Sequence, residues 1–125
     1  MMRILLVDDS TVMRKILTRS ITQAGFAVDE FLEASDGMQG MEVLNKEGKV
    51  DLILSDWNMP IMDGLEFVEE VRAGSDEINS IPIIMVTTEG GDAKVAESVA
   101  AGANGHVKKP FTTDDLQNAL GKFLS

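Results

Sequence analysis

The chain contains 125 residues, which is the size of one ordinary domain and too short for two. Apolar residues make up 44% of it and charged residues 26%, so the composition indicates a water-soluble globular protein and argues against a disordered or membrane protein. Acidic residues outnumber basic ones by 21 to 11, and a chain with a net charge of −10 lacks the surplus of Lys and Arg that binds nucleic-acid phosphates.

Five short apolar runs of strand length recur along the chain. Three of the five are almost continuously aliphatic, which is typical of parallel strands covered by helices on both faces. We therefore expect them to form one central parallel sheet. The runs are Arg3–Asp8, Val28–Ala34, Asp51–Asp56, Ile81–Thr87 and Asn104–Lys108.

Segments with helical spacing follow these runs. Glycines at 25, 48 and 74 come near the ends of the first three segments, where glycine commonly terminates a helix. Thr112 and Asp115 have the spacing of a capping box that opens the last helix. Apolar residues three and four positions apart predict four clear helices, around Val12–Ala24, Met38–Leu44, Leu65–Val71 and Leu116–Phe123.

A further helix, between about Asp92 and Ala101, is more weakly specified. Val95 and Val99 are its only large apolar residues, and the pair Gly90 and Gly91 precedes it. Because so little apolar surface anchors it, we expect this segment to be mobile. A glycine-rich loop beside a poorly anchored helix also suits a segment with two arrangements of similar energy.

Location and domain organisation follow from what the sequence lacks. There is no cysteine, which excludes disulfides, thiol catalysis and cysteine-based zinc sites. The apolar run Ile4–Val7 is too short for a signal peptide or a membrane span. No linker-like stretch or repeat interrupts the chain. We expect residues 1–125 to be one cytoplasmic domain with no second module and no membrane contact.

The alternation of strands and helices predicts a three-layer α/β/α sandwich with a doubly wound parallel sheet. Ligands of such sheets bind at the carboxyl ends of the strands. The polar residues expected at that edge are Asp8, Asp9, Asp56, Thr87 and Lys109.

Three carboxylates at one edge repel one another unless a cation neutralises them. Ligands that are all oxygen, with no Cys in the chain, suit Mg²⁺. A carboxylate beside such an ion can attack phosphorus and form an aspartyl phosphate, while a lysine ammonium offsets charge on the phosphoryl oxygens. We expect Asp56 to be that nucleophile, with Lys109 as the lysine and Thr87 as a hydroxyl donor.

Each residue also has a simpler explanation. Asp8 and Asp9 could cap the first helix, and Asp56 could belong to the turn formed by the following Asn, Pro, Asp and Gly residues. Thr87 and Lys109 could be solvated or locally bonded. The joint placement of all five at one edge favours the functional interpretation.

Four motifs carry a resemblance to a known family: LLVDDS, DLILSDWNMPIMDG, MVTTE and HVKKPF. In this order and at these separations, they resemble the receiver domains of two-component response regulators, and in particular the stand-alone, chemotaxis-type (CheY-like) ones. The resemblance covers nearly the whole chain. It implies a (βα)5 fold with the flavodoxin-like strand order 2-1-3-4-5 and no output domain.

The resemblance implies that Asp56 accepts a phosphoryl group from the phosphohistidine of a sensor histidine kinase, and that the protein is not a classical enzyme but catalyses its own phosphorylation and dephosphorylation. Asp9, Asp56 and the backbone carbonyl of Asn58 would ligate Mg²⁺, and Asp8 would help through water. Lys109 aligns with the family lysine because it directly precedes Pro110, and the peptide bond between them would be cis rather than trans.

The switch residues implied by the resemblance are Thr87 and His106. In the family, the threonine moves toward the phosphoryl group while an aromatic residue on the fifth strand swings inward. His106 departs from the usual Tyr or Phe and would add sensitivity to pH near neutrality. Asn58 and Glu89 resemble positions that tune the dephosphorylation rate, in the pattern of short-lived phosphoforms.

Trp57, the only tryptophan, follows the phosphoacceptor directly. We expect it to pack at the surface and to report on the site. The implied output is binding to a downstream protein by a monomer, with a flagellar motor switch protein as the family-based expectation. A phosphorelay intermediate or sink, and a degenerate receiver that acts only as a docking module, stay open as alternatives.

Two other classes share parts of this chemistry. A phosphatase of the haloacid dehalogenase class carries its nucleophile in a D-x-D pattern on the first strand and usually has a cap domain. Here Asp8 and Asp9 are adjacent, and 125 residues leave no room for a cap. A flavodoxin-like flavin carrier needs a phosphate-binding loop after the first strand, where this chain has two carboxylates.

Overall fold

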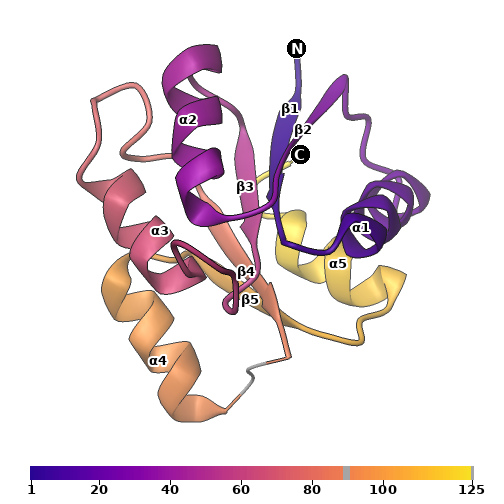
Figure 1. Cartoon of the computed structure of the whole chain (residues 1–125). Coiled ribbons are helices and arrows are strands. Elements are labelled where there is room, and N and C mark those ends of the chain that lie inside the picture. Colours follow the sequence, from indigo (N-terminus) through magenta and orange to yellow (C-terminus); the bar gives the residue numbers. More distant parts are fainter. Residues whose placement is uncertain (89–90, 125) are drawn as a thin grey trace.

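The computed structural model describes residues 1–88 and 91–124, so Glu89 and Gly90, for which the sequence suggested roles in dephosphorylation and in a mobile loop, lie outside the described residues. Strands and helices alternate along the chain (Figure 1). In chain order they are β1 (Arg3–Val7), α1 (Thr11–Gln23), β2 (Glu30–Ala34), α2 (Gly37–Glu47), β3 (Leu52–Ser55), α3 (Gly64–Arg72), β4 (Ile83–Thr87), α4 (Asp92–Ala101), β5 (Gly105–Lys108) and α5 (Thr113–Leu120).

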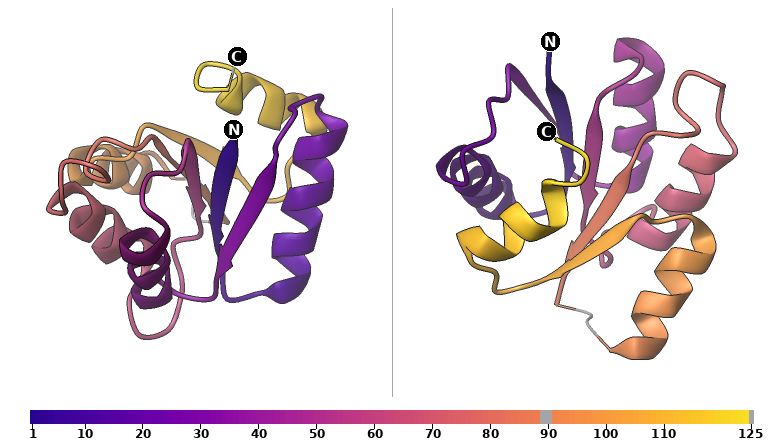
Figure 2. Two further views of the ribbon diagram at one scale, coloured as in Figure 1. Left: turned by 90° about the horizontal axis from the view of Figure 1, so that it is seen from above. Right: turned by 180° about the vertical axis from the view of Figure 1, so that it is seen from behind.

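The strands form one sheet in the order β2-β1-β3-β4-β5, and every neighbouring pair is parallel. Helices α1 and α5 cover one face, and α2, α3 and α4 cover the other (Figures 1 and 2). The predicted three-layer sandwich and its strand order are therefore confirmed. Because all strands run the same way, their carboxyl ends lie along one edge, which is the lower edge of Figure 1.

The strand β1 shows how the sheet is buried on both sides. Ile4 and Leu6 belong to the core cluster beneath α1 and α5, and Leu5 and Val7 belong to the cluster beneath α2 and α3. All four are at most 1% exposed. A strand buried on both faces requires a continuous apolar run, which explains why this segment shows no alternation of polar and apolar residues.

Several helix ends match what the sequence indicates. Thr112 and Asp115 form a complete capping box, and Gly25 follows α1 with a φ of 97°, a left-handed conformation that favours glycine. Strand β2 begins at Glu30 rather than at Val28. The backbone N–H groups of Asp29 and Glu30 both donate to the carbonyl of Met2, so the chain bends there before the ladder begins.

Helix α4 has the weakest anchoring that the structure describes for a helix. Its N-cap residue, Gly91, provides no side-chain hydrogen bond, and Ser98 is its one buried residue. Val99 is 56% exposed and so contributes little to the core. In the described part of the chain, no helix is both long enough and apolar enough to cross a membrane.

Candidate phosphoacceptor site

Three carboxylates meet at the carboxyl ends of β1 and β3. Asp8 and Asp9 follow β1, and Asp56 follows β3, which pairs directly with β1. The N–H of Asp56 donates to the carbonyl of Val7 at 2.9 Å, so the pairing continues to the edge. One carboxylate oxygen from each aspartate lies within 4.8 Å of the others. Asp8 is buried, Asp56 is half-buried and Asp9 is exposed, so the cluster opens to solvent on one side.

Lys109 supplies a cation to this cluster. Its Nζ lies 2.8 Å from Oδ2 of Asp8 and 3.4 Å from Oδ2 of Asp56. The neighbouring Lys108 is exposed, so the structure places the second lysine of the pair in the site, as expected from its position before Pro110. The peptide bond between Lys109 and Pro110 is cis, as the resemblance implied.

Thr87 is fully buried at the end of β4, next to β3, the strand that precedes Asp56. Its hydroxyl hydrogen-bonds to the carboxyl group of Asp56. The N–H of Lys109 donates to the carbonyl of Thr87 at 2.9 Å, which joins the ends of β4 and β5. The structure thus brings together all five residues that the sequence placed at this edge.

The surroundings of Asp56 shift the pKa of its carboxyl group upward. Burial, the largest influence, raises the pKa of Asp56, and the nearby carboxylate of Asp8 raises it as well. The ammonium of Lys109 acts in the opposite direction, as do hydrogen bonds from the Trp57 N–H and from Thr87. Because burial outweighs the effect of Lys109, the pKa of Asp56 is raised overall.

The donor set fits Mg²⁺. Every candidate ligand is a carboxylate or carbonyl oxygen, which is the donor type that hard divalent cations prefer. Three aspartates share this cluster with the lysine Lys109, and this excess of acidic groups gives a cation an electrostatic reason to bind there. Asn58 is exposed in the turn after β3, where its backbone carbonyl could complete the set.

The turn between β3 and α3 depends on a glycine that the sequence indicated only as part of a loop. The N–H of Gly64 donates to the carbonyl of Trp57 at 2.7 Å. A Cβ atom at Gly64 would lie 2.1 Å from the backbone oxygen of Asp56. Only glycine allows α3 to begin so close to the backbone of Asp56.

Trp57 is not at the surface, which corrects the expectation from the sequence. It is 5% exposed and belongs to the same core cluster as Phe67 and Val68 of α3. The Nζ of Lys94, from α4, lies 4.9 Å from the centre of the indole ring. Burial of the large apolar ring removes more apolar surface from water than packing against the polar residues of the following turn would.

His106 lies on β5 and is half-buried. Its Cα pairs with Met85, two residues before Thr87 on the adjacent strand. Together with Lys108, Asp115 and Asn118, it lines a cavity of about 360 Å³ between β5 and α5. His106 thus lies on the strand next to β4, which carries Thr87, and β4 separates it from β3, the strand that precedes Asp56. The coupling of His106 to Thr87 stays a prediction.

Comparison with known proteins identifies the family to which the chain belongs. The family model of the response regulator receiver domain matches residues 4–121. The chemotaxis protein CheY homolog of Campylobacter jejuni (strain 81-176) is 44% identical over 123 residues, covering 98% of this chain and 92% of that protein.

Solved structures show the same relationship. The chemotaxis protein CheY4 of Vibrio cholerae aligns with a TM-score of 0.85 at 37% identity and covers 99% of both chains. The receiver domain of the sensor histidine kinase PA1611 from Pseudomonas aeruginosa aligns with a TM-score of 0.83 at 27% identity, covering 98% of this chain and 97% of that one, and its structure has a magnesium ion coordinated in the active-site cleft. The chain described here belongs to the response regulator receiver domain family and is of the CheY type, a signalling protein rather than a classical enzyme.

Proposed function

We propose that this protein is a two-component response regulator that accepts a phosphoryl group on Asp56 from the phosphohistidine of a sensor histidine kinase. The observation that carries the proposal is the convergence of Asp8, Asp9 and Asp56, with the ammonium of Lys109 in contact with Asp8 and Asp56. Capping or turn formation alone does not explain why a lysine 101 residues away in sequence reaches Asp8.

In the transfer, a carboxylate oxygen of Asp56 attacks the phosphorus atom. The new O–P bond forms as the N–P bond to the imidazole breaks, and the imidazole nitrogen keeps the electron pair of that bond. Lys109 offsets charge on a phosphoryl oxygen, and the hydroxyl of Thr87 can turn from the carboxyl group of Asp56 to another phosphoryl oxygen. Mg²⁺, when bound, would supply charge neutralisation and align the phosphoryl oxygens.

The cation would be held by Asp9, Asp56 and the backbone carbonyl of Asn58, with Asp8 contributing through water. Hydrolysis of the aspartyl phosphate by water returns Asp56 to the carboxylate, so the protein catalyses both its own phosphorylation and its own dephosphorylation. The similarity to named chemotaxis proteins supports a role in chemotaxis.

The output in this proposal is protein–protein binding by residues 1–125 acting as one monomeric receiver domain in the cytoplasm. Phosphorylation shifts a population of conformations through Thr87 and His106. The downstream target is a protein partner of the kind found in flagellar motor control.

The proposal is tested by intact-mass spectrometry after incubation with acetyl phosphate and Mg²⁺. We expect the mass of one phosphoryl group to be added to the wild type, to be absent with EDTA, and to be absent in Asp56→Asn. A parallel assay with p-nitrophenyl phosphate should show no sustained turnover. Labelling that persists in Asp56→Asn, or multiple turnover of the ester by the wild type, would contradict the proposal.

A further inference from the structure

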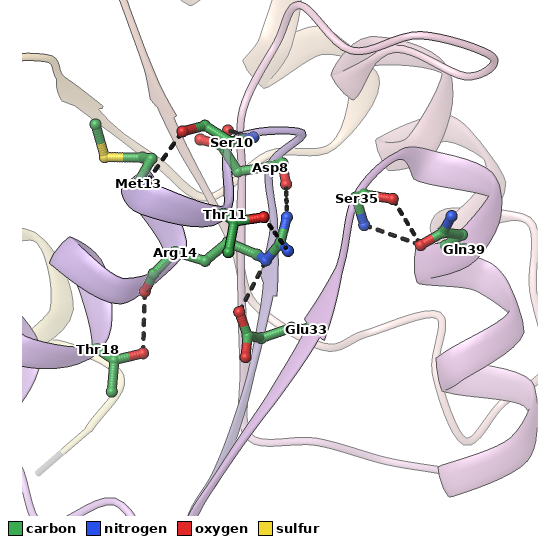
Figure 3. A network of polar contacts seen from close by, with 9 residues as sticks. All are labelled: Asp8, Ser10, Thr11, Met13, Arg14, Thr18, Glu33, Ser35 and Gln39. Carbon is green, nitrogen blue, oxygen red and sulfur yellow. Dashed lines mark hydrogen bonds and ion pairs between the residues drawn. The ribbon is translucent and has the colours of Figure 1, made fainter.

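Arg14, in the second turn of α1, makes three side-chain hydrogen bonds, two of which join α1 to other segments (Figure 3). Its Nη1 donates to the backbone carbonyl of Asp8. Its Nε donates to Oε1 of Glu33 on β2 at 2.8 Å, and its Nη2 donates to the hydroxyl of Thr11 at 3.2 Å. The side chain of Arg14 is only 13% exposed. A planar guanidinium bonded along three directions has a fixed orientation.

The polar groups of Asp8 are held on all sides. Its N–H donates to the carbonyl of Ala34 at 3.0 Å. Its carboxylate accepts from the Ser10 N–H at 2.9 Å and from Lys109 at 2.8 Å. The carbonyl of Asp8, which belongs to the peptide that links Asp8 to Asp9, accepts a hydrogen bond from Arg14. Arg14 therefore fixes the peptide plane from which both carboxylates project.

The hydrogen bond from Arg14 restrains the turn after β1, in which electrostatic repulsion between carboxylates favours movement. Asp8 and Asp9 carry like charges, and a third carboxylate, Asp56, lies within 4.8 Å of both. Repulsion between these groups favours conformations of the turn that separate them. A charge-assisted hydrogen bond to the carbonyl opposes that separation, because the guanidinium is itself held by Glu33. The ligand oxygens are thereby kept close before any cation arrives.

We propose that Arg14 is a positioning residue for the Mg²⁺ site: its bridge from Glu33 to the Asp8 carbonyl increases the affinity for Mg²⁺ even though its own charge repels a cation. The inference rests on the proposed function only in taking the three aspartates as the metal site. Groups that orient metal ligands without touching the metal commonly change affinity by about 10- to 100-fold. The bridge also makes Glu33, an edge-strand residue, part of the support of the site.

A positioning role and a purely electrostatic role of Arg14 predict different Mg²⁺ affinities when Arg14 is replaced. If Arg14 acted only as a nearby positive charge, Arg14→Gln would bind Mg²⁺ more tightly, and Arg14→Lys would be unchanged. If Arg14 positions the turn, both variants bind Mg²⁺ more weakly, since lysine keeps the charge but cannot reach three acceptors at fixed angles. A matched control is Arg19→Gln, which removes the same charge from an exposed position of the same helix.

The experiment is a titration of Trp57 fluorescence with MgCl2 alone, at low and high ionic strength, after thermal denaturation has shown that each metal-free variant is folded. We expect the Kd for Mg²⁺ to rise about tenfold in Arg14→Lys and Arg14→Gln. In Arg19→Gln we expect it to be unchanged, or slightly lower at low salt only. Thr11→Val, which removes one acceptor of the guanidinium and keeps every charge, should shift the Kd in the same direction by less.

Tighter binding by Arg14→Gln together with an unchanged Arg14→Lys would overturn the inference and leave the proposed function intact. If neither Arg14 variant folds, the Thr11→Val variant is the test, and a Kd for Mg²⁺ equal to that of the wild type would overturn the inference. Failure of the wild type to bind Mg²⁺ would instead contradict the proposed function itself, and the inference with it.

Discussion

At the scale of single residues, the burial of the Asp56 carboxyl group beside Asp8 links the site to stability. Because the folded-state pKa of Asp56 lies above the ordinary value of 3.8, the folded protein holds this proton more tightly than the unfolded chain does. The contribution of Asp56 to the free energy of unfolding is therefore present at low pH and is lost as the pH rises through the raised folded-state pKa. At pH values above that pKa, the ionised carboxylate destabilises the metal-free protein.

Asp56→Asn should consequently raise the melting temperature of the metal-free protein at pH 7, and the gain should shrink as the pH falls toward the ordinary carboxyl pKa. Thermal denaturation across this pH range measures the effect. Asp76→Asn removes an exposed carboxylate elsewhere and serves as the control. An Asp56→Asn protein that is no more stable than the wild type at pH 7 would contradict this account.

Lys109 gives a second test at the residue scale. Its ammonium lowers the pKa of Asp56, so Lys109→Met should raise that pKa further in the metal-free protein. Lys108→Met removes the same charge from the neighbouring exposed residue and should leave the Asp56 pKa nearly unchanged. Carbon-13 NMR titration of the Asp56 carboxyl group distinguishes the two, and equal shifts in both variants would show that the contacts of Lys109 are unimportant.

At the scale of elements, the start of α3 controls the shape of the site. Gly64→Ala would place a methyl group against the backbone oxygen of Asp56, at 2.1 Å without adjustment. We expect a loss of about 1–3 kcal/mol in the free energy of unfolding, as for other overpacked sites, together with weaker Mg²⁺ binding. Urea denaturation and the Trp57 titration measure the two effects.

Gly91→Ala is the matched control for this change, because nothing lies within 4 Å of a Cβ atom built there and its φ of −70° suits any residue. It should leave both stability and Mg²⁺ affinity close to those of the wild type. If Gly64→Ala behaves like Gly91→Ala, the close approach of α3 to the backbone of Asp56 is not a constraint on the site.

At the scale of the whole molecule, two core clusters share the central strands and should unfold together. Phe67, in α3, is fully buried in the cluster on the face of the sheet that α2 and α3 cover. Leu120, in α5, is fully buried in the cluster on the opposite face, which α1 and α5 cover. Truncation to Ala should cost about 3–5 kcal/mol for Phe67 and about 2–5 kcal/mol for Leu120.

Because the two side chains lie on opposite faces of the sheet, their effects should add. Urea denaturation followed by Trp57 fluorescence, which reports on the Phe67 side, should coincide with that followed by circular dichroism in each single variant. Separate transitions for the two probes in Leu120→Ala would contradict a single cooperative core.

The fold was predictable because strands and helices depend on the spacing of apolar residues that are close together in the sequence. The aliphatic run of β1 and the periodic stripe of α1 have lengths and spacings that a single strand and a single helix require. The edge position of the five site residues followed from parallel strands ending together. Motifs then indicated the family, and the comparisons confirmed it.

What the sequence did not indicate depends on distances between segments. An arginine in a helix does not reveal that it reaches the Asp8 carbonyl and Glu33, and a glycine after an aspartate looks like any turn. The burial of Trp57 likewise follows from packing by α3 and α4 rather than from its neighbours in sequence.

The central claim, that Asp56 is the phosphoacceptor of a Mg²⁺-dependent switch, is tested most directly by Trp57 fluorescence. Mg²⁺ is added first and beryllofluoride second, to the wild type and to Asp56→Asn. We predict quenching by Mg²⁺ in the wild type, followed by a saturable change with beryllofluoride that requires both Mg²⁺ and Asp56. A folded wild-type protein that responds to neither addition, or an Asp56→Asn variant that responds to beryllofluoride as the wild type does, would contradict the claim.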